Sequence, residues 1–161
     1  MDTKEFTDLH IHTIFSYDGR NAMEDYVVAA IARGDKRIGF SEHYDYDCVL
    51  CGTGQNTPPC NVEEYKDELL RLTEKYGESI EILFGAEFGY DKRATERYGE
   101  LVEKYRFDYV INSVHLYNGT DFYLLQACYH TKNFNDTVGH FHKVHILINH
   151  IQLANLALCP F

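Results

Sequence analysis

Short apolar segments alternate with longer amphipathic segments through the first 115 residues, and this alternation constrains the fold more than any other feature. Each apolar segment is long enough for one buried strand, and the intervening segments have the length and periodicity of helices. A strand followed by a helix and another strand is typical of a parallel sheet. The sequence therefore predicts an α/β fold with strands over residues 8–13, 37–43, 80–87 and 108–115.

Helix boundaries are predicted from capping signals. Asn21, with Glu24 three residues later, has the form of a capping box, and the helix that it begins should end at Gly34. Asn61 begins a second helix in the same way, which continues with apolar residues at helical spacing. A third helix with a charged outer face is expected over residues 92–105.

The segment Asp8-Leu9-His10-Ile11-His12-Thr13 places two imidazoles one pleat apart. Successive strand side chains point to opposite faces, so His10 and His12 would share a face with Asp8. Two neutral imidazoles at this spacing suit one metal ion, and Asp8 could orient an imidazole or lie at the mouth of the strand. The alternative is a solvated strand face that carries two histidines by chance.

Ligand-type residues recur at the carboxyl ends of the predicted strands. His43, Glu87 and His115 end the later strands, as His10 and His12 end the first. The carboxyl ends of parallel strands lie on one face, where such folds build their active sites, so these side chains are expected to meet there. Each has another explanation alone, since a histidine can cap a strand and Glu87 could pair with a lysine or an arginine. Their repeated placement favours a shared metal site.

The charge of the chain limits its partners. With 25 acidic and 15 basic residues the net charge is −10, so the chain lacks the basic surface that binds a phosphate backbone, and nucleic acid is not expected. An acidic chain favours divalent cations. The N-terminus has no signal-peptide pattern and polar residues interrupt the apolar run 146–158, so we expect a cytoplasmic protein without a membrane span.

The segment 44–60 carries glycine and proline without periodicity and is predicted to be one long loop, a type that often acts as a lid. Cys48, Cys51 and Cys60 fall in it. A structural zinc site needs a second pair of ligands, and a thioredoxin-like site needs a helix start, so neither is predicted. Free thiols are expected instead, because the five cysteines are odd in number and irregularly spaced.

Four sequence motifs resemble those of a known family. In order they are Asp8–Thr13 with Asp18-Gly19, Ser41–Asp45, Gly85–Glu87 and Ser113–His115. Through them the chain resembles the polymerase and histidinol phosphatase (PHP) family, most closely its histidinol-phosphatase branch. The resemblance covers about the first three quarters of the chain and implies a distorted (β/α)7 barrel of TIM-like form, incomplete here. It also implies a cluster of up to three metal ions at the C-terminal face.

The metal ligands implied by the resemblance are His10, His12, Asp18, His43, Glu87 and His115. Within this set the first two histidines would share an ion with Glu87, which would bridge to a second ion bound by His115. The remaining two residues would hold a third ion. The ions would be zinc, manganese or iron, and no catalytic residue beyond these ligands can be assigned.

The activity implied is hydrolysis of a small phosphorylated substrate, L-histidinol phosphate, to L-histidinol and phosphate in histidine biosynthesis. Divalent ions support such a reaction because they activate water and neutralise phosphoryl charge. Two alternatives stay open. A metal-binding remnant or an interaction module would bind metal without catalysis. A hydrolase acting on C–N bonds would share the His-x-His strand but should show a lysine or a different carboxylate order.

The last part of the chain departs from the family pattern. The family uses a later histidine and a final Asp-x-His motif, but no Asp-x-His follows His12 in this sequence. The length of 161 residues also falls short of the roughly 250 of a full barrel. Residues 1–125 are therefore expected to form the N-terminal βα units of a PHP domain. Residues 126–161 are expected to be a divergent or truncated tail of that domain, as in a truncated or frame-shifted gene or an unusual family member.

The predicted tail carries little charge, since only three residues from position 126 onward are charged. It carries several histidines whose spacing fits no single helix or strand face, so no second metal site is predicted there. Four of them are His140, His142, His145 and His150. An incomplete barrel would leave strand edges and apolar helix faces uncovered, which favours association, so a homo-oligomer is expected.

Overall fold

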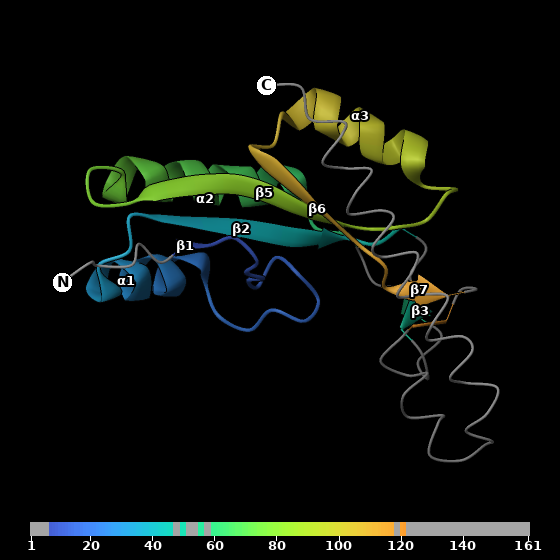
Figure 1. Ribbon diagram of the computed structural model, residues 1–161, viewed down its shortest axis with the longest axis horizontal. Coiled ribbons are helices and arrows are strands. Elements are labelled where there is room, and N and C mark those ends of the chain that lie inside the picture. Colours follow the sequence, from blue (N-terminus) through green and yellow to red (C-terminus); the bar gives the residue numbers. More distant parts are fainter. Residues whose placement is uncertain (1–6, 47–48, 51–54, 57–58, 118–119, 122–161) are drawn as a thin grey trace, which may run out of the picture.

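A parallel sheet of four strands forms the centre of the structure (Figure 1). This computed structural model describes residues 7–46, 49–50, 55–56, 59–117 and 120–121. The strands lie in the order β1-β2-β5-β6, and all neighbouring pairs are parallel. Their bounds are Thr7–Asp8 for β1, Arg37–Tyr44 for β2, Glu81–Gly89 for β5 and Tyr109–Ser113 for β6.

Three helices connect these strands, namely α1 (Met23–Arg33), α2 (Val62–Tyr76) and α3 (Thr95–Tyr105). Alternate residues of β2 and β5, such as Phe40 and Phe84, are buried in one core with apolar side chains of the helices. The predicted α/β alternation is therefore confirmed. Because strand side chains alternate, the residues between these core positions, such as His43 and Glu87, point to the opposite face of the sheet.

The sheet curls as a half-barrel, and one tyrosine spans the face opposite the helices. Tyr109 of β6 donates a hydrogen bond through its hydroxyl to the carbonyl oxygen of Leu9, directly after β1, at 2.8 Å. Its side chain passes close over Gly39 and Gly85, where a Cβ atom would overlap it. The two glycines therefore let the tyrosine lie flat against the sheet and join its two edge strands.

Most predicted element boundaries agree with the structure to within a few residues. Gly34 ends α1 in the left-handed conformation, with φ of 84°, as predicted. Asn61 caps α2, since its side chain accepts a hydrogen bond from the backbone N–H of Glu64 at 3.5 Å. The third helix begins at Thr95, later than the predicted residue 92.

The capping box predicted at Asn21 is wrong. Ala22 is the N-cap of α1, and no side chain caps the helix there. Glu24 instead extends across to α2, where it accepts hydrogen bonds from the side chains of Lys75, Tyr76 and Arg71. These donors lower the pKa of Glu24 to about 2. Contacts with a second helix therefore replaced the local contact that the sequence pattern predicted.

The first strand is much shorter than predicted, since β1 ends at Asp8 rather than near residue 13. The chain still follows the edge of β2 for a few residues, because Ser41 donates its backbone N–H to the carbonyl oxygen of Ile11 at 3.0 Å. His10 and His12 therefore lie on an irregular segment, not on one face of a regular strand.

The predicted loop 44–60 contains a short antiparallel pair, β3 (Val49–Leu50) with β4 (Gln55–Asn56). A similar pair, β7 (Leu116–Tyr117) with β8 (Thr120–Asp121), follows the sheet. Strands of two residues are too short to leave a periodic signal in the sequence. Cys60 at the end of the loop is a buried free thiol, as predicted.

Several predictions lie outside the described residues, among them those for Cys48, Cys51, the tail 126–161 and its histidines. The predicted division of the chain at residue 125 and the expected homo-oligomer stay predictions. None of the helices in the described part of the chain combines the length and the apolar character that a membrane span requires.

Substitution of two leucines of α2, Leu70 and Leu72, tests which face of this helix packs in the core. Leu72 is fully buried, whereas the Leu70 side chain is 54% exposed. We expect Leu72→Ala to lower the free energy of unfolding by about 2–5 kcal/mol, because it leaves a cavity under the sheet. Leu70→Ala should change it by less than about 0.5 kcal/mol. Urea unfolding of both variants measures the difference, and equal effects would contradict the packing of α2 described above.

Candidate metal centre

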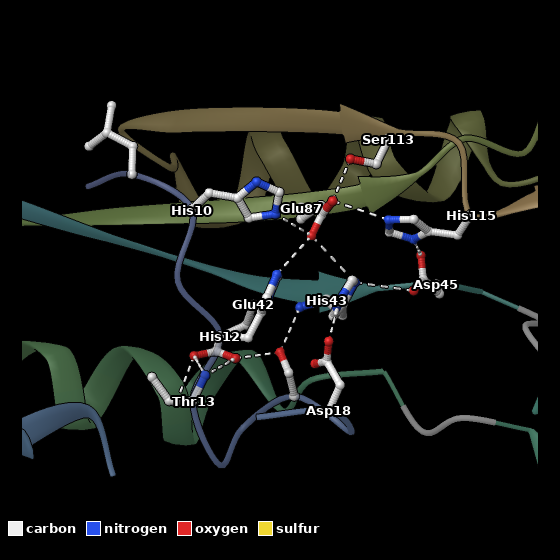
Figure 2. Close-up of polar contacts among 12 residues, drawn as sticks. His10, His12, Thr13, Asp18, Glu42, His43, Asp45, Glu87, Ser113 and His115 are labelled. Atoms are coloured by element: carbon white, nitrogen blue, oxygen red, sulfur yellow. Dashed lines mark hydrogen bonds and ion pairs between the residues drawn. The ribbon is translucent and has the colours of Figure 1, made fainter. Parts of the chain in front are cut away.

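Histidine and carboxylate side chains converge at the carboxyl ends of the sheet strands (Figure 2). They come from four places: the irregular segment after β1, the turn that follows it, the last residues of β2 and β5, and the residues just after β6. The converging residues are His10, His12, Asp18, His43, Glu87 and His115. All six residues predicted from the sequence are therefore brought together.

The register of β2 and β5 places two of these residues side by side. His43 pairs with Glu87 in the parallel ladder, and both side chains are nearly fully buried, with exposed fractions of 6% and 2%. Burial of a carboxylate and an imidazole is costly unless both are paired. Their surroundings must therefore supply partners.

Glu87 lies at the centre of the cluster, and its two oxygens face different histidines. Oε2 lies 3.0 Å from Nε2 of His10 and 3.1 Å from Nε2 of His12. Oε1 lies 3.1 Å from Nε2 of His115 and accepts a hydrogen bond from the Ser113 hydroxyl. One carboxylate therefore connects two sets of nitrogen donors.

His43 lies between the two remaining parts of the cluster. Its Nε2 lies 3.3 Å from Oδ2 of Asp18, and its Nδ1 lies 3.6 Å from Oε2 of Glu87. Its ring stacks on the ring of His12, with centroids 4.2 Å apart and planes inclined by 9°. Both nitrogens of His43 therefore face carboxylate oxygens of the cluster.

Three overlapping groups of ligand atoms result, and within each group the atoms lie within 4.8 Å of one another. Neighbouring groups share His12, His43 or Glu87, so the three groups form one continuous cluster. The groups are His10 with His12 and Glu87, His12 with Asp18 and His43, and His43 with Glu87 and His115.

Burial and contacts within the cluster shift the pKa values of three of its side chains. Burial alone would raise the pKa of Glu87, but hydrogen bonds from His115, His12 and Ser113 hold it well below its usual range. For His115, burial lowers the pKa, but the partners Asp45 and Glu87 outweigh burial and raise it to about 10. Burial likewise lowers the pKa of His12, and the contact with Glu87 raises it above its ordinary value.

Asp45 is a member of this site that the sequence reasoning missed as a functional residue. It is buried, its Oδ1 lies 2.7 Å from Nδ1 of His115, and its Oδ2 lies 3.2 Å from Nδ1 of His43. It therefore orients His115 through a hydrogen bond and lies beside His43, whose Nδ1 has no hydrogen-bond partner among the described residues. Its position two residues after His43 along an extended segment was the available signal, because alternation puts both on one face. Ser113, also missed, donates a hydrogen bond to Glu87, and Glu42, also missed, accepts one from Thr13, which directly follows His12.

An open groove of about 460 Å³ adjoins the cluster. His10, His12 and Asp18 line one part of it, and Arg20 and Tyr26 line another. The groove gives the cluster a solvent-accessible side where a small molecule could approach. Arg20 is a cation that lines the same groove as these ligand-type side chains.

The donor set fits a divalent metal ion. Two ligands of a tetrahedral zinc ion, with bonds of about 2.0–2.1 Å, lie about 3.3 Å apart. The closest pairs of possible ligand atoms in the cluster, a histidine nitrogen and a carboxylate oxygen in each case, lie 3.0–3.3 Å apart, which agrees with that separation. Nδ1 of His12 is buried and has no hydrogen-bond partner among the described residues. The three groups contain histidine, aspartate and glutamate side chains.

Comparison with known proteins identifies relatives of one kind. The chain is 35% identical over 123 residues to the histidinol-phosphatase of Lactococcus lactis, a match that covers 73% of this chain and 44% of that protein. It is 31% identical over 121 residues to a probable histidinol-phosphatase of Clostridium acetobutylicum, covering 72% of this chain and 42% of the relative. The chain thus spans less than half the length of these relatives.

A solved structure of a protein of the same kind is also similar to this chain. The histidinol phosphate phosphatase of Lactococcus lactis, crystallised with zinc, L-histidinol and phosphate, superimposes with a TM-score of 0.65 at 31% identity. The superposition covers 73% of this chain and 43% of the crystallised chain. The sequence model of the PHP domain matches residues 8–154, which is most of the chain. On these grounds the chain belongs to the PHP family.

Proposed function

We propose that this chain is a metal-dependent phosphomonoester hydrolase that acts on L-histidinol phosphate. The observation that carries the proposal is the position of Glu87, whose two carboxylate oxygens face separate histidine groups within hydrogen-bond distance. A bridging carboxylate is typical of sites that hold two ions close together. The relatives named histidinol-phosphatase, one of them crystallised with zinc, L-histidinol and phosphate, support the choice of substrate.

The proposed centre holds up to three ions of zinc, manganese or iron. The first would be held by His10, His12 and Glu87, and a second by Glu87 with His115. Asp18 and His43 would hold a third, with His12 as a neighbour. When bound, such ions lower the pKa of water and neutralise the charge of a phosphoryl group.

Neighbouring side chains orient the ligand-type residues of the proposed centre. Asp45 accepts a hydrogen bond from Nδ1 of His115 at 2.7 Å, and after His115 loses its second ring proton this contact would leave Nε2 as the atom that can bind an ion. Ser113 donates to Glu87 and helps to keep that carboxylate ionised. The groove lined by Arg20 and Tyr26 gives a phosphorylated substrate access to the centre from one side.

The second candidate function is metal binding without turnover. Under this alternative the half of the cluster around Glu87 would bind a single ion. The number of ions per chain therefore separates the two candidates, because two or three ions support catalysis.

Replacement of Glu87 tests the main proposal. We expect Glu87→Gln to lose at least one bound ion per chain and to lower phosphate release from L-histidinol phosphate by at least about 100-fold, since the variant removes the charge that two histidine groups share. Glu81→Gln is the matched control, because Glu81 begins the same strand but is exposed and pairs with Arg37. Elemental analysis and a phosphate-release assay measure both effects. Metal-loaded wild-type chain without turnover would contradict the hydrolase and favour the second candidate.

The pH dependence of metal binding is a separate test. In the metal-free protein the pKa of His115 is raised to about 10, so this imidazole is protonated at neutral pH and must lose its proton before it can bind a metal. Metal affinity should therefore rise with pH, by up to about tenfold per unit for one released proton, throughout the range below pH 10. Titration calorimetry with Mn²⁺ in buffers of different ionisation enthalpy measures the proton release. His115→Ala should reduce it, and pH-independent binding would contradict the coupling.

A further inference from the structure

A buried carboxylate outside the three ligand groups lies directly beside them. Glu42 precedes His43 in β2 and has no exposed surface. By strand alternation its side chain points away from the face that carries His43. A buried charge in this position is destabilising unless donors surround it.

The donors come from a single turn. The backbone N–H of Thr13 is shared between both oxygens of Glu42, at 3.0 and 3.1 Å, and the Thr13 hydroxyl donates to Oε1 at 2.6 Å. The Ser16 hydroxyl donates to Oε2. Figure 2 shows these contacts beside, but separate from, the contacts of Glu87.

Ser16 also connects this turn to the edge of β2. Its hydroxyl oxygen accepts the backbone N–H of His43 at 2.9 Å. The regular pairing of β1 with β2 has already ended at Asp8, so this hydroxyl takes the place of a strand partner. The turn is also closed on itself, because Ser16 donates its own N–H to the carbonyl oxygen of Thr13 at 2.9 Å.

The turn fixed in this way carries two ligand-type residues. His12 directly precedes Thr13, and Asp18 follows Ser16 by two residues. The third member of their group, His43, is bound to the same turn through its backbone. Glu42 thus binds Thr13 and Ser16. These two residues belong to or contact the segments that carry the whole group of His12, Asp18 and His43.

We propose that Glu42 is a positioning residue that holds the turn 12–18 on β2 and so assembles the ion site of His12, Asp18 and His43. The proposal rests on the metal centre proposed above. Glu42 is not itself a ligand, since it belongs to none of the three ligand groups and its oxygens are occupied by the turn.

The contacts make this role selective for one part of the centre. Glu87 and His115 are held by Ser113 and Asp45, and among the described residues neither of these two side chains forms a hydrogen bond with the turn. Loss of the Glu42 contacts should therefore weaken the ion site that contains Asp18 and leave the site between Glu87 and His115 in place. A residue that served only general stability would weaken all sites together.

The test measures metal content rather than turnover. We expect Glu42→Gln to retain the fold, to bind one ion fewer per chain under a limiting chelator, and to lower the affinity of that ion by about 10–100-fold, as replacement of residues that support metal ligands does. Asp35→Asn is the matched control, because Asp35 is another buried carboxylate, paired with Arg33 away from the cluster. The Asp35→Asn variant should have lower thermal stability but the same number of bound ions per chain as the wild type. Elemental analysis, chelator competition and thermal unfolding give the three readouts.

A double variant identifies the site that is affected. If Glu42 acts on the group that contains Asp18, Glu42→Gln in an Asp18→Asn background should remove no further ion, because the two losses are not additive.

If Glu42→Gln fails to fold, Ser16→Ala provides the same comparison, since it breaks the connection to His43 and should lose the same ion. An unchanged ion count in the folded variant, or a proportional loss of all ions with stability, would overturn the proposal. Wild-type chain that binds its ions but hydrolyses nothing would remove the hydrolase and leave this result unaffected.

Discussion

The parallel pairing of β2 with β5 sets His43 opposite Glu87, and the geometry of the candidate site depends on this register. The residues before and after this pair, such as Tyr44 and Ala86, are buried in the core under the helices. A shift of one residue would exchange the two faces, so His43 and Glu87 would point into the core and Tyr44 and Ala86 would take their places. Packing of the core and assembly of the site are therefore enforced by the same alternation.

Charge balance is the second constraint on the site. Glu87, Asp45 and Glu42 are all nearly inaccessible to solvent, yet each has its own donors, which come from histidines, from Ser113 or from the turn after His12. In the metal-free protein His115 acts as a protonated partner of Glu87 and Asp45, because these two carboxylates raise its pKa to about 10. A divalent ion offers the same positive charge to the same oxygens. The cluster is thus stabilised by positive charge, which protons supply and which an ion at the proposed centre would supply in their place.

The sequence predicted the strands and five of the clustered residues because both depend on local patterns, whereas Asp18 was predicted only from the family resemblance. His43, Glu87 and His115 each end a short apolar run, and the parallel order of the strands brings their ends together. Asp45 and Glu42 were missed as functional residues because the hydrogen-bond partners that define their roles lie 26 to 70 residues away. The wrong capping box at Asn21 has the same origin, since Glu24 binds a helix that the local pattern does not include. Patterns along the chain predict elements, and contacts between distant segments decide how side chains are used.

Tyr109 has a consequence for the dimensions of the site. Its hydroxyl reaches the backbone just after β1 from the far edge of the sheet, and its ring occupies the space that Gly39 and Gly85 leave without a side chain. His10 follows Leu9 directly, so the residue that accepts this hydrogen bond also fixes how far the first histidine can move from Glu87. The breadth of the ligand-bearing surface is therefore tied to the length of one tyrosine side chain, and a side chain at either glycine would collide with that ring.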